Sequence, residues 1–203
     1  MADKIKTAIL TGNLKPGERL KEQDLCDELN VSRTPLREAY RILQSQALIE
    51  YNPYQGVFVA ELTEKYIREL WFIKCLLEPE AAALAARHIT ESGIAQMEEI
   101  LDDAEVSNLI TPYDFVMYDN KFHGAIAANS GNEELHKIIV QSYESTLLPR
   151  SRTVIKNRTI LSSHEEHKRI FSAIRNGDIE AARKHTLEQL DAGLDAVLLT
   201  LEK

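Results

Sequence analysis

The chain lacks the hydrophobic segments of a membrane or exported protein. None of its 203 residues lie in an apolar run that approaches the roughly 18 residues of a transmembrane helix. The first residues, MADKIKTAIL, have too short an apolar stretch for a signal peptide, and no small-residue cleavage site follows them. We therefore expect a cytoplasmic protein with no membrane partner.

Cysteine is scarce. The two cysteines, Cys26 and Cys75, lie far apart in the sequence. A chain without an export signal is expected to keep its cysteines reduced, because disulfides persist mainly in oxidising compartments. We predict two separate core thiols rather than a disulfide.

The chain also lacks an excess of positive charge. Residues 1–62 carry 8 Lys/Arg against 9 Asp/Glu, and residues 63–203 carry 16 against 23, so the two parts have net charges of −1 and −7. This balance excludes a protein that coats nucleic acid nonspecifically. It does not exclude a DNA-binding protein, because phosphate contacts depend on where the cations lie.

Residues 22–60 carry the most informative pattern in the chain. Asn30 separates two short helical segments, Ser32 is a good N-cap for the second, and Pro35 falls within its first turn. The expected helices are 3–11, 22–29 and 32–45, and the expected strands are 48–51 and 57–60, joined by a loop at 52–56. This order predicts a winged helix-turn-helix, whose second helix enters a DNA major groove.

After Leu62 the apolar residues follow helical spacing, and no alternating strand pattern appears. The expected helices are about 64–89, 91–106, 112–129, 132–149, 160–176 and 178–202, with caps at Thr63, Thr90, Thr111, Ser162 or Ser163, and Asp178. We predict a mainly α protein with two domains. A winged helix-turn-helix over residues 1–62 precedes an all-helical antiparallel bundle of about six helices over residues 63–203.

The start of the expected helix 32–45 suits DNA. Arg33 and Arg37 are four residues apart and share a helical face, and arginine makes bidentate contacts to guanine. Ser32 and Thr34 add hydroxyl groups beside the positive end of the helix dipole, which favours phosphate. Gly56 lets the wing backbone approach the minor groove closely. The alternative is a solvated pair of surface arginines.

The stretch ILTGNLKPGERLKEQDLCDELNVSRTPLREAYRIL closely resembles the DNA-binding domain of the GntR family of bacterial transcription regulators, over roughly residues 4–60. The resemblance implies that Arg33 and Arg37 read bases, while Ser32, Thr34 and Gly56 position the DNA backbone. Some members carry an arginine where this chain has Gln23. Glutamine prefers adenine or accepts water-mediated contacts.

Three residues of the second part can bind a metal ion. Asp119 and His123 lie one helical turn apart on one face, and His167 belongs to another helix. Bundles build metal sites from such side chains on facing helices. The alternative is that Asp119 and His123 form only a hydrogen-bonded pair on a helix.

The second part also resembles the FCD ligand-binding domain of the FadR-like branch of GntR regulators, over most of residues 63–190. Six expected helices favour the shorter, VanR-like subgroup. The resemblance rests on 77–82 with 84–86, 119–123, 166–167, 173–174, 177–178 and 181–182.

This resemblance implies a divalent ion, such as zinc or nickel, at Asp119, His123 and His167. A further histidine is expected twenty-two residues after His167, where this chain has Gln189. An amide oxygen is a harder and weaker ligand than imidazole. The site is expected to bind metal less tightly, to take a different ion, or to hold a ligand through hydrogen bonds alone. His185, one turn before Gln189, is a possible substitute.

Lys74, Arg150 and Arg152 are candidates to hold an anionic effector, and the alternative for each is a solvated surface cation. We expect Trp71, Phe72 and Phe122 in the core, and His88, His136 and His164 on the surface.

Taken together, these features predict a regulator that binds an inverted-repeat operator in double-stranded DNA as a homodimer. A small organic carboxylate in the bundle would control its DNA affinity, and repression is the expected outcome. One alternative is a regulator whose bundle only dimerises and senses no ligand. A remote alternative is a metal-dependent enzyme. The absence of an evident general base near the candidate metal ligands in the sequence argues against it.

Overall fold

The computed structural model describes residues 1–103, 112–153 and 160–201. The chain divides into two compact units, Met1–Thr63 and Glu64–Lys203. Within the described residues, no helix is both long enough and apolar enough to cross a membrane.

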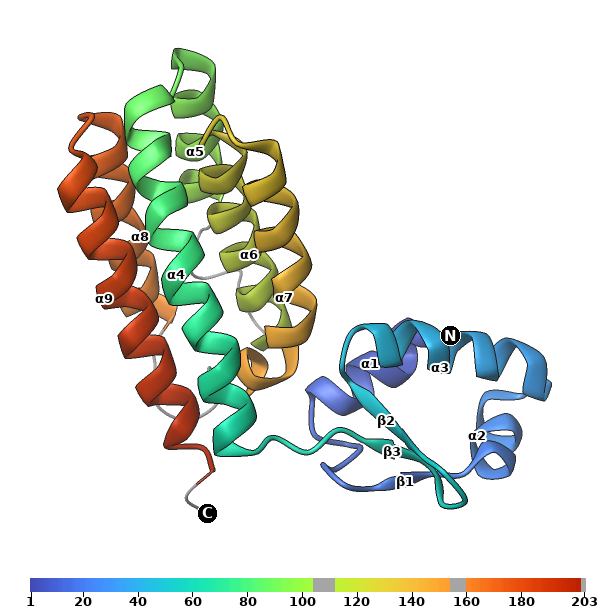
Figure 1. Cartoon of the computed structure of the whole chain (residues 1–203). Coiled ribbons are helices and arrows are strands. Elements are labelled where there is room, and N and C mark those ends of the chain that lie inside the picture. The colour runs from blue at the N-terminus through green and yellow to red at the C-terminus, as the bar shows by residue number, and fades with distance from the viewer. Residues whose placement is uncertain (104–111, 154–159, 202–203) are drawn as a thin grey trace. The chain divides into compact units, whose positions relative to one another are not determined.

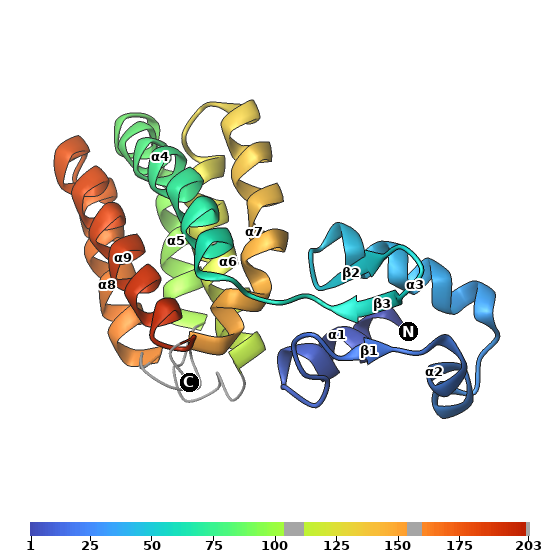
Figure 2. The same ribbon diagram turned by 60° about the horizontal axis from the view of Figure 1, so that its bottom comes forward.

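The first unit combines three helices with a small antiparallel sheet (Figure 2). Its elements are α1 (Ala2–Leu10), β1 (Arg19–Leu20), α2 (Glu22–Leu29), α3 (Arg33–Ser45), β2 (Ile49–Asn52) and β3 (Gly56–Val59). The strand order is β1-β3-β2, and Phe58 of β3 lies opposite both Arg19 and Glu50. The sequence predicts β2 and β3 but not β1, because a two-residue strand has no readable periodicity.

Helix α3 has one buried face and one exposed face. Its buried residues recur at spacings of three and four: Leu36, Ala39, Tyr40 and Leu43. The Tyr40 hydroxyl donates a hydrogen bond of 3.2 Å to the Leu20 carbonyl oxygen, which ties α3 to β1. Because the inner face is fixed by the core, the arginines at the start of α3 remain on the outer face.

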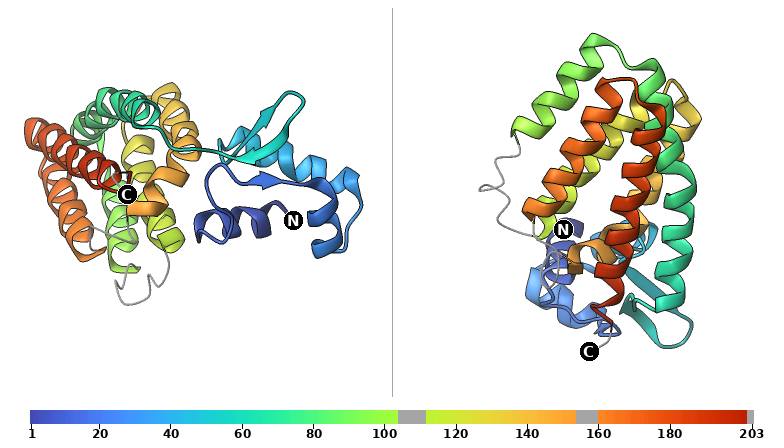
Figure 3. Two further views of the ribbon diagram at one scale, coloured as in Figure 1. Left: turned by 90° about the horizontal axis from the view of Figure 1, so that it is seen from below. Right: turned by 90° about the vertical axis from the view of Figure 1, so that its left-hand side faces the viewer.

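The second unit is a helical bundle, so the predicted fold class is confirmed (Figure 1). The described residues contain six helices: α4 (Glu64–His88), α5 (Glu91–Asp103), α6 (Pro112–Ala128), α7 (Glu133–Thr153), α8 (Ile160–Arg175) and α9 (Ile179–Leu198). Helices α4 and α9 run side by side in opposite directions (Figures 1 and 3). Alanines of α4 at 81, 82, 85 and 86 are buried in the core, and such small side chains allow helices to approach closely.

Two predicted caps are confirmed and others are not. Asp178 accepts a hydrogen bond of 3.0 Å from the Ala181 amide, and Thr90 accepts one of 3.2 Å from the Gly93 amide. The prediction for Ser162 or Ser163 is wrong, because α8 already begins at Ile160. Thr111 lies outside the described residues.

Helix α7 continues through Pro149 to Thr153, beyond the predicted end at residue 149. Proline removes one backbone donor and crowds the preceding turn. Leu147, Leu148 and Arg150 are all buried around it. Their packing stabilises the turn that the proline weakens.

Both cysteines are free thiols, as predicted; Cys26 is buried and Cys75 is half-buried.

Candidate functional site

The first candidate site is the exposed face of α3, where Arg37 is held by a residue of α2. Arg37 donates from Nε to Glu22 Oε1 at 2.9 Å and from a terminal nitrogen to Glu22 Oε2 at 3.0 Å. The hydrogen bond from Arg37 lowers the pKa of Glu22, so this carboxylate stays charged at neutral pH. The Arg37 guanidinium is therefore held in one orientation in the absence of a ligand.

Arg33 is also held from α2. It donates to Gln23 Oε1 at 3.0 Å, and Gln23 Nε2 in turn donates to both carboxylate oxygens of Asp27 at 3.0 and 3.1 Å. Ser32 and Thr34 are exposed beside Arg33. Ser32 stands at the N-cap position, but its side chain makes no capping hydrogen bond, which leaves its hydroxyl available to a ligand.

The wing completes this surface. Gly56 has φ 102°, a backbone conformation that side chains rarely adopt, at the start of β3. Tyr54, at the tip of the loop, is fully exposed. A cavity of about 370 Å³ lies between α3 and the strands, and Arg37, Arg41 and Tyr51 are among its lining residues.

The second candidate site lies inside the bundle, where Asp119 and His123 of α6 meet His167 of α8. One ligand atom from each lies within 4.8 Å of the others. Asp119 Oδ1 is 3.0 Å from His167 Nε2 and 3.8 Å from His123 Nε2. Both histidines are buried, and Phe122 stacks on the His167 ring with 4.3 Å between centroids.

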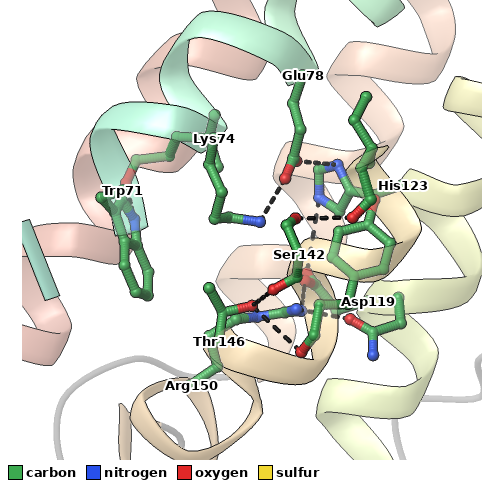
Figure 4. A network of polar contacts seen from close by, with 12 residues as sticks. Trp71, Lys74, Glu78, Asp119, His123, Ser142, Thr146 and Arg150 are labelled. Carbon is green, nitrogen blue, oxygen red and sulfur yellow. Dashed lines mark hydrogen bonds and ion pairs between the residues drawn. The ribbon is translucent and has the colours of Figure 1, made fainter. Parts of the chain in front are cut away.

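Neighbouring residues orient both imidazole rings (Figure 4 shows the His123 side). Glu78 Oε2 of α4 lies 3.2 Å from His123 Nδ1, and the Tyr118 hydroxyl lies 3.1 Å from His167 Nδ1. With each Nδ1 engaged, each Nε2 faces Asp119, as in histidines that bind metals. Burial raises the pKa of Glu78, but the charges of Lys74 and His123 outweigh it and leave that pKa below its ordinary value.

The sequence alone did not identify these orienting residues. Tyr118 also lies 2.8 Å from His164 Nδ1, so the expectation of a surface His164 is wrong. Burial lowers the pKa of His164 and raises that of Tyr118. One sequence signal pointed to Tyr118: it directly precedes the candidate ligand Asp119 on the same helix, and so lies close to the candidate metal site.

Two of the three candidate effector residues lie in this site rather than on the surface. Arg150 pairs with Asp119 Oδ2 and donates to Asn120 Oδ1 at 2.6 Å. Lys74 pairs with Glu78, and both cations are buried. These contacts contradict the alternative of solvated surface cations for Lys74 and Arg150. The side chain of Arg152 lies outside the described part of the chain.

A cavity of about 50 Å³ opens onto these groups, enough for a few waters or a small acid. Its polar lining consists of Lys74, Asp119, His123, Arg150 and Gln189. Gln189 is 5% exposed, and its Oε1 has no hydrogen-bond partner among the described residues. Because a buried acceptor without a partner is costly, this oxygen is suited to a ligand.

Other expectations near the cavity have mixed outcomes. Trp71 is buried, donates from Nε1 to the Leu190 carbonyl oxygen at 3.0 Å, and lines the cavity. Phe122 is buried in the core, whereas Phe72 is 66% exposed, so the core prediction for Phe72 is wrong. His185 lies 3.1 Å from Glu188 and lines a second cavity, which Gln189 also borders. It does not line the cavity that contains Asp119 and His123, so it does not take the place of Gln189 there.

The donor set suits a divalent metal ion. Two imidazole nitrogens and one carboxylate oxygen lie close together, and Glu78 and Tyr118 orient the two imidazole rings. The Gln189 amide oxygen, which has no hydrogen-bond partner among the described residues, lines the cavity beside them. These residues therefore fit a metal of the kind that accepts mixed nitrogen and oxygen ligands.

Family models match both units. The model of bacterial regulatory proteins of the gntR family matches residues 1–59, and the model of the FCD domain matches residues 69–192.

Individual proteins resemble the chain along nearly its whole length. It is 27% identical over 203 residues to the uncharacterized HTH-type transcriptional regulator YdhC of Bacillus subtilis (strain 168), covering 99% of this chain and 91% of that protein. It is 28% identical to the galactonate operon transcriptional repressor of Escherichia coli (strain K12), covering 90% and 88%.

A solved structure of a GntR transcriptional regulator from Rhodococcus sp. RHA1 has the same fold, with a TM-score of 0.73 and 24% identity over 97% of this chain and 95% of that one. The chain therefore belongs to the gntR family of bacterial regulatory proteins, in the branch that carries an FCD domain, and it is a DNA-binding transcription regulator rather than an enzyme.

Proposed function

We propose that the chain is a dimeric repressor that binds an inverted-repeat operator through α3 and releases it when a small carboxylate binds the helical unit. The observation that supports DNA reading most directly is the pair Arg33 and Arg37. Both are exposed on one face at the start of α3, and each is held in place by α2. Two such helices about one DNA turn apart would read the two half-sites.

The test is a comparison of operator affinity after removing one arginine. DNA duplexes selected from a random pool by the full chain serve as the operator. Arg37→Ala is expected to weaken specific binding by about 1–3 kcal/mol with the fold intact, because a bidentate base contact is lost. Lys137→Ala, which removes an exposed cation from the helical unit, is the control. Equal affinity in wild type and Arg37→Ala would contradict this role for α3.

We infer that a divalent ion binds Asp119 Oδ1, His123 Nε2 and His167 Nε2, with Gln189 Oε1 as an additional oxygen ligand. Such an ion would attract the carboxylate of an effector as a Lewis acid. Lys74 and Arg150 add positive charge to the same cavity, although each is already paired with a carboxylate. An anionic effector therefore fits the chemistry of the lining.

Metal affinity tests this ligand set. Dialysed protein is expected to retain about one divalent ion per chain, and His123→Ala is expected to retain less. Gln189→His is expected to bind more tightly, because imidazole replaces a weaker amide ligand. The control His88→Ala changes an exposed histidine in the same unit. An unchanged metal content in His123→Ala would place the site elsewhere.

The effector is expected to be a small organic acid. One relative represses a galactonate operon, which is in keeping with a carboxylate signal. Titration of a panel of small carboxylates into the metal-loaded chain, followed by DNA binding at saturation, tests the response. If no acid binds, the second candidate function gains support, in which the helical unit only dimerises.

A further inference from the structure

We propose that Gln23 and Asp27 act as positioning residues for Arg33, so that this chain reads guanine through Arg33 and does not read adenine through Gln23. The inference rests on the proposed function, because it assumes that α3 faces the bases. It assigns a specificity role to two residues of α2, of which Asp27 makes no hydrogen bond or ion pair with Arg33.

Asp27 decides which way the Gln23 amide points. A carboxylate only accepts hydrogen bonds, so the group facing Asp27 must be the amide nitrogen. Gln23 Nε2 lies 3.0 and 3.1 Å from the two Asp27 oxygens. The amide oxygen is thereby turned toward α3, where it accepts from Arg33 at 3.0 Å.

This arrangement occupies both polar groups of Gln23. Recognition of adenine by glutamine requires the amide oxygen for N6 and the amide nitrogen for N7 at the same time. In the structure the nitrogen is engaged with Asp27 and the oxygen with Arg33. Adenine reading would therefore have to use the second lone pair of the amide oxygen and the second N–H of the amide nitrogen, in the amide orientation that Asp27 and Arg33 impose.

Arg33 keeps the donors that guanine needs. A guanidinium has five N–H groups in a planar fork, and the contact to Gln23 uses only one terminal nitrogen. The remaining donors are sufficient for a bidentate contact with guanine O6 and N7. Holding the long side chain in advance also lowers the conformational entropy that binding would otherwise cost.

Glu22 and Arg37, next to Gln23 and Arg33, are arranged in the same way. Glu22, directly before Gln23, holds Arg37 with two hydrogen bonds. Two consecutive residues of α2 thus each fix one arginine of α3. The difference is that Glu22 acts directly, whereas Asp27 acts on Arg33 through an amide.

The test is the base preference of variants of the full chain, selected against a randomised pool of DNA duplexes. Wild type is compared with Arg33→Ala, Gln23→Ala and Asp27→Asn. Glu28→Gln is the matched control, because it removes the same charge from an exposed neighbour on α2. Thermal unfolding of each variant checks that the first unit remains folded.

We expect Arg33→Ala to reduce the preference for one guanine by roughly 5- to 150-fold. Gln23→Ala and Asp27→Asn are expected to reduce the preference at that same base pair by a smaller factor, and Glu28→Gln is expected to leave it unchanged. Asp27→Asn should also bind random DNA at least as well as wild type, because it removes negative charge near the phosphates.

Two results would overturn the inference while leaving the proposed function intact. In one, Gln23→Ala loses an adenine preference at a base pair that Arg33→Ala and Asp27→Asn leave unchanged. In the other, Gln23→Ala and Asp27→Asn keep every wild-type preference. If wild type itself selects no sequence, the proposed function fails and the inference fails with it.

Discussion

Tyr54 is a strained residue at the tip of the wing. The Gln55 amide donates to the Asn52 carbonyl oxygen at 3.1 Å across a tight turn with Pro53 as its second residue. Tyr54, the third residue, has φ 67°. Turns of this kind favour glycine there, because a side chain in the left-handed region costs about 1–2 kcal/mol. The ring is fully exposed, so core packing does not explain its presence.

We predict that Tyr54→Gly stabilises the first unit by up to about 1 kcal/mol, since the strain relieved exceeds the entropy cost of glycine. The same variant should bind operator DNA more weakly, because the wing loses a large exposed ring at its tip. Urea unfolding and DNA titration measure the two effects. Tyr54→Ala is the control, which removes the ring but keeps the strained backbone and so should lose affinity without gaining stability. A destabilised Tyr54→Gly would contradict this account.

At the scale of elements, the orientation of the two histidine rings in the candidate metal site depends on how three helices meet. Helix α6 supplies Asp119 and His123, and α8 supplies His167. Helix α4 supplies Glu78 behind His123, while Tyr118 of α6 lies behind His167. The ring orientations therefore depend on packing among α4, α6 and α8.

We predict that Tyr118→Phe lowers metal affinity by roughly 10- to 100-fold while leaving every proposed metal ligand in place. The hydroxyl lost in this variant lies within hydrogen-bond distance of both His164 and His167. Calorimetric metal titration measures the change. Tyr143→Phe removes a buried hydroxyl that has no hydrogen-bond partner among the described residues, so it should have little effect. Equal losses in both variants would point to general loosening of the bundle.

At the scale of the whole molecule, reading an inverted repeat requires two copies related by a twofold axis. Helix α4 has an exposed apolar row made of Phe72, Ile73 and Leu76, which are 66%, 46% and 56% exposed. The first and last are four residues apart and so share a face. We propose that this row packs against a second copy, because regulators of this family typically act as dimers.

We predict that Phe72→Glu raises the dimer dissociation constant by about tenfold or more, since a buried phenylalanine contributes roughly 1.5–3 kcal/mol. Analytical ultracentrifugation over a concentration series measures it. Leu161→Glu, which changes an exposed leucine of α8, is the control. A dimer that resists Phe72→Glu but dissociates in Leu161→Glu would place the interface on α8.

The sequence by itself determined the helices, the two strands of the wing and their order, but not the two-residue strand β1. Helical spacing predicted α4 to α9, and a left-handed residue at Asn30 with an N-cap position at Ser32 marked the turn between α2 and α3. These signals are local, because caps, turns and amphipathic spacing act within a few residues. The same locality explains why Asp119 and His123 were recognised as neighbours, one helical turn apart.

Only the tertiary structure decided which helix faces meet. Glu78 and Arg150 come from α4 and α7, and nothing in their sequence spacing links them to His123 or Asp119. Tyr118 directly precedes Asp119, but its contact with His167 of α8 depends on how α6 and α8 pack. Arg150 was expected either to hold an effector or to remain in solvent, yet it is buried on Asp119. Likewise, the hydrogen bonds that connect Asp27 to Arg33 through Gln23 depend on how α2 packs against α3. Side-chain spacing fixes the contacts within one helix, whereas burial of apolar surface selects the contacts between helices.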